Sequence, residues 1–164
     1  MRVLGVDPST VATGWGILDG DSRHARCVDQ GVLRPAARSP VPHRLRTIHD
    51  GLVAILERFP IDVVAIESAF LHRNVRTALA LGEVRGVVLL LAACKQTPIA
   101  EYSAAEVKRA AVGYGAADKE QVARMMARVL SLAPPLQLDA ADALAVAWCH
   151  LARAARPIIA GAPR

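Results

Sequence analysis

The sequence lacks the features that would place it in a membrane or outside the cell. Its longest unbroken apolar run, from Gly86 to Cys94, is far shorter than the ~20 residues that a helix needs to cross a bilayer. The N-terminus has no basic stretch followed by an apolar one, which is the pattern of a signal peptide. We therefore expect a cytoplasmic protein.

Paired cysteines are also missing. Cys27, Cys94 and Cys149 are odd in number, and none belongs to a CxxC or Cys/His pattern. This spacing argues against a disulfide framework and against a zinc site. We expect reduced thiols in the core.

Charged or proline-rich blocks are absent too, which argues against a disordered chain. Hydrophobic residues make up 53% of the 164 residues, enough to bury a core without covalent links. No linker or repeat divides the chain. We assign residues 1–156 to a single domain and residues 157–164, rich in Pro, Gly and Ala, to a short flexible C-terminal tail.

The charge that is present is mostly positive. There are 20 Lys and Arg against 15 Asp and Glu, and the net charge is +5. A basic and apolar chain of this kind favours a polyanionic partner, with nucleic acid as the first candidate.

The chain opens with a hairpin that carries an acid at its mouth. Residues 3–7 form an apolar run that ends in Asp7, Pro8 stops it, and residues 11–18 form a second strand-like run. Residues 23–33 read as a third strand, which predicts an antiparallel meander. Asp7 alone could simply cap its own turn.

Turn and cap signals mark the other elements. Turns are expected at residues 19–21 and at Gly31, and Ser39 followed by Pro40 predicts the start of an amphipathic helix that continues to Phe59. Further on, a short strand is expected at residues 98–102. Helix-start signals then follow at Ser103 with Glu106 and at Asp118 with Gln121.

Residues 61–67 repeat the pattern of the first strand, in which a nearly continuous apolar run ends in an acid, here Glu67. In open α/β sheets the carboxyl ends of strands are where ligands bind. The next helix, from about residue 75 to 95, carries Gly82 and Gly86 on one face, where another backbone could approach. We expect it to pack inside the protein and to pair with its own copy.

The last helix begins with two acids, Asp139 and Asp142, whose spacing places them side by side on its first turn. Both could serve only as caps that complement the helix dipole.

Together, Asp7, Glu67, Asp139 and Asp142 form a set of hard oxygen ligands at the ends of elements. Such carboxylates repel one another unless a cation joins them, and without His or Cys they select Mg²⁺ or Mn²⁺. In a basic protein this favours metal-assisted phosphodiester hydrolysis, with two ions in each site.

The order of these features resembles the RuvC Holliday-junction resolvases of the RNase H-like superfamily. The resemblance is carried by Asp7-Pro8 after the first strand, "AIE" ending at Glu67, "GxxRG" over residues 82–86, and "DAADALA" over residues 139–145. It implies an α/β RNase H-like fold, in which a mixed five-stranded sheet of an antiparallel three-strand meander followed by parallel strands is flanked by helices.

The resemblance also implies a function. The chain would be a homodimer that binds four-way junction DNA, nicks it symmetrically with Mg²⁺ at the four acids, and works with the branch-migration proteins RuvA and RuvB in recombination and repair. By position, Phe70 resembles the family's aromatic beside the scissile region, although an ordinary core role is open. The DNA-contacting set that we expect is Phe70, Arg73, Asn74, Arg76, Lys108 and Lys119.

Two departures and three alternatives accompany this interpretation. Ser9 stands where the family usually has glycine, and the C-terminal tail is short, which removes a possible extra basic contact. A sugar-kinase or actin-type ATPase shares the opening Asp, but needs a second domain and a second phosphate loop. Another RNase H-like nuclease with a different nucleic-acid substrate, and a junction-binding module without catalysis, remain open.

Overall fold

The computed structural model describes residues 1–68 and 75–154. Its centre is a five-stranded sheet with the strand order β3-β2-β1-β4-β5. β1, β2 and β3 are antiparallel neighbours, and β4 and β5 continue the sheet in parallel with β1. The strands are β1 Arg2–Asp7, β2 Thr13–Gly20, β3 Ala25–Leu33, β4 Val63–Glu67 and β5 Ile99–Tyr102.

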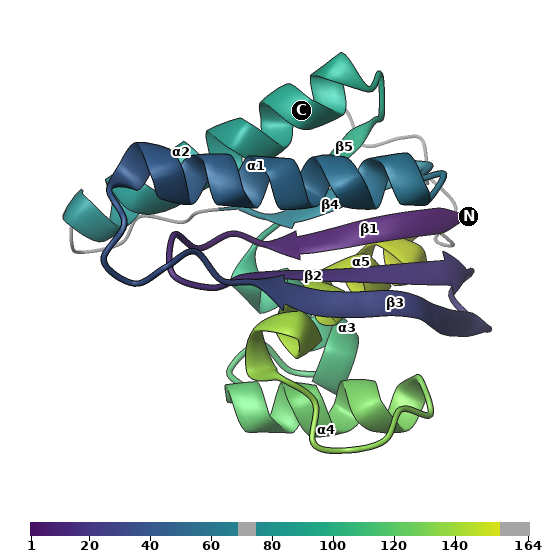
Figure 1. Cartoon of the computed structure of the whole chain (residues 1–164). Helices are drawn as coiled ribbons and strands as arrows, with labels where there is room; N and C mark the ends of the chain where they lie inside the picture. Colours follow the sequence, from purple (N-terminus) through teal and green to yellow (C-terminus); the bar gives the residue numbers. More distant parts are fainter. Residues whose placement is uncertain (69–74, 155–164) are drawn as a thin grey trace, which may run out of the picture.

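Helices cover both faces of this sheet (Figure 1). One face packs against α1 and α2, and the other packs against α3, α4 and α5. The helices are α1 Val41–Arg58, α2 Val75–Cys94, α3 Ala104–Val112, α4 Lys119–Val129 and α5 Leu138–Ala154. The predicted meander followed by parallel strands is confirmed.

The alternation of side chains along β1 decides where its acid points. Leu4 and Val6 are buried against α1 and α2, whereas Val3 is buried in the core beneath α5. Because successive side chains of a strand face opposite sides, Asp7 falls on the α5 side. The same alternation in β4 places Glu67, two residues after Ala65 of the α5-side core, on that side too.

Several local predictions are confirmed and others are wrong. Complete capping boxes open α3 at Ser103 and α4 at Asp118. Helix α1, however, has Pro40 at its N-cap, because the Ser39 hydroxyl donates instead to the carbonyl of Ala36. Gly31 is not a turn residue: it lies within β3 opposite Trp15, whose indole would lie 3.0 Å from an added Cβ.

Helix α2 is less buried than expected. Cys94 at its end is exposed, so the prediction of a core thiol is wrong there, whereas Cys149 is buried. By length and composition alone α2 could cross a membrane. That is weak support for a membrane span, because core helices of other proteins pass the same test. Among the described residues, α2 is a long apolar helix with one exposed face, which carries Val75, Leu79 and Leu90.

Candidate active site

Asp7 and Glu67 meet at one edge of the sheet. β1 and β4 are parallel neighbours, and their last registered pair is Val6 with Ile66. Each acid is the next residue along its own strand, and adjacent strands lie about 4.8 Å apart. The carboxyl ends of two central strands therefore deliver two carboxylates side by side, facing α5.

Helix α5 brings the other two acids to the same edge. Gly14, which pairs with Asp7 across β1 and β2, lies so close to α5 that an added Cβ would be 1.9 Å from the backbone oxygen of Asp139. Only glycine allows this approach. Helix α5 therefore begins directly over the first residues of β2, and Asp139 and Asp142 lie on its opening turns next to Asp7.

The pKa of Asp7 reflects the proximity of the other three acids. Burial, followed by the negative charges of Asp142, Glu67 and Asp139, raises its pKa from 3.8 to about 7, and Lys119 opposes the shift. A raised pKa of this size is typical of clustered, desolvated carboxylates. The other three predicted acids thus all act on Asp7 in the folded chain.

Lys119 places a positive charge within this cluster. Its Nζ lies 2.7 Å from Oδ2 of Asp142, whose side chain is 15% exposed. Burial raises the pKa of Asp142, while the hydrogen bond and charge of Lys119 lower it. Burial also works to lower the pKa of Lys119, but its hydrogen bond to Asp142 and the surrounding acids outweigh burial and raise it. Lys119 stays charged beside the acids.

Arg34 is a second cation at the cluster, and sequence reasoning missed it. It follows the last residue of β3, and its Nη2 lies 3.5 Å from Oδ2 of Asp139. Its Nη1 donates to Oε1 of Gln137 at 3.0 Å. The signal that could have found it is a basic residue directly after a strand that ends at this edge.

These carboxylates fit a divalent cation by their chemistry. Hard oxygen donors suit Mg²⁺ or Mn²⁺, and a bound cation would relieve the repulsion that raises the pKa of Asp7. Within residues 1–68 and 75–154, no three acid, His or Cys side chains already surround a common point. Asp142 and Asp139 instead pair with Lys119 and Arg34. A cation that bound Oδ2 of either acid would therefore compete with its basic partner.

Of the predicted DNA-contacting residues, three lie in the described part. Lys108 on α3 is close enough for its charge to lower the pKa of Asp142, so it joins Lys119 at the cluster. Arg76 lies exposed on the first turn of α2, soon after β4 ends at the same edge. The predictions for Phe70, Arg73 and Asn74 fall outside the described residues.

The two glycines predicted at a dimer interface lie on an open surface. An added Cβ at Gly82 or Gly86 would meet no described atom within 4 Å. They share a stripe of α2 with exposed apolar side chains, because positions three or four apart lie on one face of a helix. The exposed apolar members of the stripe are Val75, Leu79 and Leu90.

Comparison with known proteins gives a consistent result. The family model described as "Crossover junction endodeoxyribonuclease RuvC" matches residues 3–150. A RuvC of Chloroflexus aurantiacus is 47% identical over 151 residues, which cover 92% of this chain and 92% of the relative. A RuvC of Magnetococcus marinus is 43% identical over 151 residues, covering 92% of this chain and 84% of the relative.

Solved structures agree with the sequence relatives. The structure described as "T. thermophilus RuvC in complex with Holliday junction substrate" superposes with a TM-score of 0.87 and 33% identity, covering 94% of both chains. The match extends over the sheet and both helical layers.

Proposed function

Because the chain belongs to the RuvC family of crossover junction endodeoxyribonucleases, we propose that Asp7, Glu67, Asp139 and Asp142 are the residues with which it cuts four-way junction DNA. The enzyme is a metal-dependent nuclease that hydrolyses phosphodiester bonds of Holliday junctions. The kinase interpretation and the non-catalytic module are therefore set aside.

The observation that best supports this assignment is the raised pKa of Asp7. Its pKa rises to about 7 because it is buried and because three other carboxylates lie near it. Clustering of four acids at the end of a central strand has a cost in stability that a purely structural role does not explain. We infer that the cluster holds Mg²⁺, or Mn²⁺, with two ions in each site.

The four acids would divide the work at that site. Bound ions supply an activated water and stabilise the leaving oxygen. Asp7 and Glu67, fixed at the ends of β1 and β4, would hold the ions against the rigid sheet. Asp139 and Asp142 would hold the ions from the first turns of α5.

The basic residues around the acids would bind the DNA backbone. Lys119 and Lys108 lie beside Asp142, and their positions suit a phosphate next to the scissile bond. If Asp142 held an ion, Lys119 would be available to bind that phosphate. We propose Arg76, Phe70, Arg73 and Asn74 as further contacts along the β4–α2 connection.

We further propose that the active unit is a homodimer with two-fold symmetry. A four-way junction offers two equivalent strands to cut, and each chain supplies one acid cluster. The apolar stripe of α2 around Gly82 and Gly86 supports self-association. We also propose that residues 1–156 act as one nuclease domain, that RuvA and RuvB are its partners, and that it works in the cytoplasm.

A cleavage assay tests the function directly. A labelled four-way junction, a linear duplex of the same sequence and an RNA–DNA hybrid would be incubated with the protein in EDTA, Mg²⁺ or Mn²⁺. We expect paired nicks in the junction only, and only with metal. Equal cutting of the hybrid would favour the alternative of an RNase H-like nuclease with another substrate. Cleavage that survives Asp7→Asn would contradict the site assignment.

A further inference from the structure

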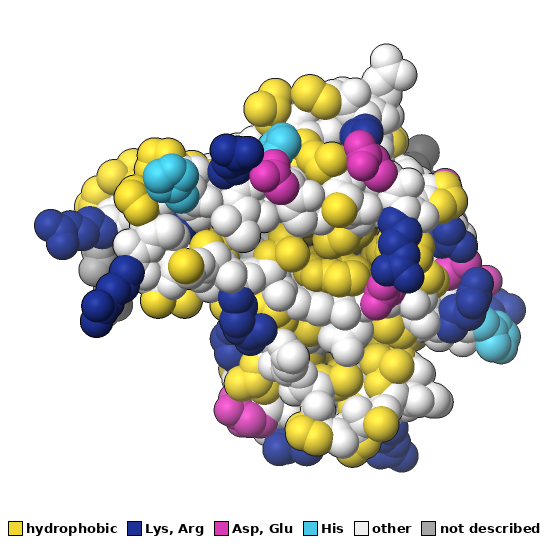
Figure 2. All heavy atoms as spheres, in the orientation of Figure 1, with side chains coloured by type: hydrophobic (Ala, Val, Ile, Leu, Met, Phe, Trp, Pro, Cys, Tyr) yellow, Lys and Arg dark blue, Asp and Glu magenta, His cyan; other side chains and the backbone are white. Residues whose placement is uncertain are grey.

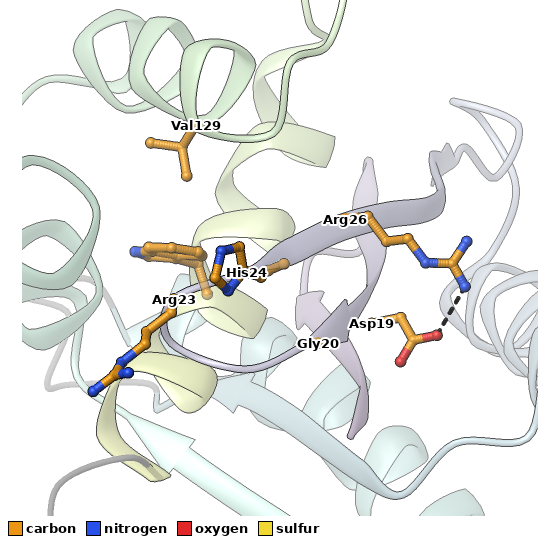
Figure 3. Close-up of a pocket in the computed structure, with 8 residues that line it drawn as sticks. Asp19, Gly20, Arg23, His24, Arg26 and Val129 are labelled. Carbon is orange, nitrogen blue, oxygen red and sulfur yellow. Dashed lines mark hydrogen bonds and ion pairs between the residues drawn. The ribbon is translucent and has the colours of Figure 1, made fainter.

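A hollow of about 540 Å³ lies where β2 turns into β3 (Figure 3). Its walls come from the turn, from the end of α4 and from the middle of α5, and it is lined by Asp19, Arg23, His24, Arg26, Val129 and Trp148. It is at the far end of β2 from Gly14, the residue that pairs with Asp7. The proposed catalytic residues do not use it.

The turn that forms this hollow has a fixed shape. Oδ1 of Asp21 accepts hydrogen bonds from the backbone N–H groups of Arg23, at 2.7 Å, and His24, at 3.0 Å. Arg26 donates to the Asp19 carboxylate at 3.0 Å. The side chain of Arg23 points away from the Asp19–Arg26 pair (Figure 3). Within the described part of the chain it takes part in no ion pair that would neutralise it.

The charge around the turn favours an anionic ligand. Positive charges outnumber negative ones at the turn, because three arginines, Arg2, Arg23 and Arg26, lie near two carboxylates, Asp19 and Asp21. Both carboxylates already accept hydrogen bonds. Val129 and Trp148 give the hollow an apolar floor. Guanidinium groups beside an apolar surface suit a phosphate attached to a sugar.

The same strand leads from this turn to the catalytic edge. β3 is an outer strand of the sheet, with Arg26 near its start and Arg34 just after its end. The one acid of β3, Asp29, lies 3.6 Å from the guanidinium of Arg58, whose positive charge offsets that of the carboxylate. Figure 2 shows Lys and Arg side chains at both ends of this edge.

With its flanking arginines, this edge is comparable in length to the repeat of a DNA duplex. Strand β3 from Ala25 to Leu33 covers about 26 Å at about 3.3 Å per residue, and the side chains of Arg23 and Arg34 extend beyond its two ends. One turn of B-form DNA is about 34–36 Å long. Arginines at the two ends of the edge can therefore reach backbone phosphates on the same face of one duplex.

We propose that Arg23 and Arg26 form a distal phosphate site that holds one duplex arm of the junction about one helical turn from the crossover. The site deepens the proposed function and rests on it, since the arm belongs to the proposed substrate. Arginines beyond both ends of one outer strand favour a duplex over the other anionic candidate, an acidic segment of a protein partner.

Arm length tests the site. Junctions with one crossover sequence and hairpin-closed arms of about 6 or about 16 base pairs would be bound to the full chain in EDTA over a range of salt. Only the longer arm can reach the turn. We expect Arg23→Ala/Arg26→Ala to weaken binding of the long-arm junction by about 5- to 10-fold. The slope of its affinity against salt should fall by about 0.9 for each phosphate that the variant no longer neutralises.

Controls separate this site from the catalytic one. The short-arm junction should bind and be cut equally by wild type and variant, and failure of the wild type to cut it would instead contradict the proposed function. Arg124→Ala removes an exposed arginine from the outer side of α4 and should leave both junctions unaffected. Arg23→Ala alone keeps the Asp19 pair and should give part of the loss.

Three results would overturn the distal site. Equal weakening on short and long arms would show a general effect of charge or folding. No weakening on either would show that the hollow does not meet the DNA. Unchanged DNA binding by the variant together with weaker binding of an acidic peptide would assign the hollow to a protein partner.

Discussion

Nζ of Lys119 lies 2.7 Å from Oδ2 of Asp142, so a basic side chain of α4 pairs with an acid of α5 inside the acid cluster proposed to be catalytic. Asp142 is therefore subject to two opposed influences, repulsion from the other acids and attraction to Lys119. Neutralising it removes both, and the change in stability of a single variant will not separate them.

A double-mutant cycle with Lys119→Met and Asp142→Asn isolates the attraction. Because Lys119 is 56% exposed and Asp142 is 15% exposed, we expect a coupling of about 1 kcal/mol in favour of the wild-type pair. Denaturant unfolding in EDTA would measure it. The parallel cycle with Lys108→Met should give a smaller coupling, because the charge of Lys108 influences the pKa of Asp142 less than Lys119 does. Equal couplings would contradict a specific pair.

Asp7 predicts an unusual dependence of stability on pH. Its pKa rises from 3.8 to about 7 on folding, so between these values the folded protein holds a proton that the unfolded chain releases. The free energy of unfolding of the metal-free protein should therefore fall as pH rises from about 4 to about 7. The upper limit of this loss is about 4 kcal/mol, at about 1.4 kcal/mol for each pKa unit.

Asp7→Asn should remove most of this dependence and stabilise the metal-free protein above pH 7. Chemical unfolding in EDTA at several pH values would show it. Asp50→Asn is the matched control, because Asp50 is exposed and its hydrogen bond to His49 lowers its pKa. A wild-type curve that rises steadily through this pH range would contradict the buried, clustered state of Asp7.

A bound metal ion should offset the repulsion between the clustered acids and so stabilise the folded protein. An ion that binds only the folded state stabilises it by about 2.7 kcal/mol at a hundred times its dissociation constant, so Mg²⁺ should raise the melting temperature of the wild type by several degrees. Asp7→Asn should respond much less. Glu57→Gln, which alters an acid paired with Lys95 on the surface, should respond like the wild type. Equal responses of all three proteins would exclude the cluster as the metal site.

The apolar stripe of α2 predicts how the dimer can be broken. Leu79 is 64% exposed in the single chain, and Asp at this position would place a charge in an interface made by two copies. We expect Leu79→Asp to be monomeric in light scattering, to keep its melting temperature within a few degrees, and to lose coordinated cutting of both strands. Val41→Asp, at an exposed apolar residue of α1, should remain dimeric. A monomeric wild type that still nicks both strands together would contradict the dimer.

Much of this architecture could be predicted because its causes are local. Apolar runs that end in Asp7 and Glu67 predict strands that carry acids to one edge, and Ser103 with Glu106 forms the capping box that its spacing suggests. The capping role of Asp139 depends on a helix boundary, which local signals define less sharply. Helix α5 begins one residue earlier, at Leu138, so Asp139 lies inside the first turn and is not the N-cap.

The pairing of Lys119 and Arg34 with the acids could not be predicted, because it depends on contacts between distant segments. Arg34 reaches Asp139 only because the β2–β3 register places the end of β3 beside Thr13 and because Gly14 lets α5 approach the sheet. The place of Arg34 directly after β3 indicates the edge at which it lies, but not its pairing with Asp139. The same holds for Lys119, whose distance from Asp142 is set by the packing of α4 on α5.

Arg34 provides the last prediction. In the metal-free protein its guanidinium is 3.5 Å from the Asp139 carboxylate, which is one of the proposed metal ligands. A positive charge at this place competes with a divalent cation for the same oxygen atoms, so its removal should favour the metal. We expect Arg34→Ala to bind Mg²⁺ about 2- to 5-fold more tightly in isothermal titration calorimetry, which matches the value of a partly exposed ion pair.

The control is an arginine that forms an ion pair of the same length away from the acid cluster. Arg46 and Asp50 are also 3.5 Å apart, but their pair lies on the exposed side of α1. Arg46→Ala should therefore leave the Mg²⁺ affinity unchanged. Weaker binding of Mg²⁺ by Arg34→Ala would contradict competition between Arg34 and the metal. It would mean that Arg34 holds Asp139 in the orientation that the metal requires. Arg34→Lys separates the two, since lysine keeps the competing charge but cannot bridge Asp139 and Gln137 as the two guanidinium nitrogens do.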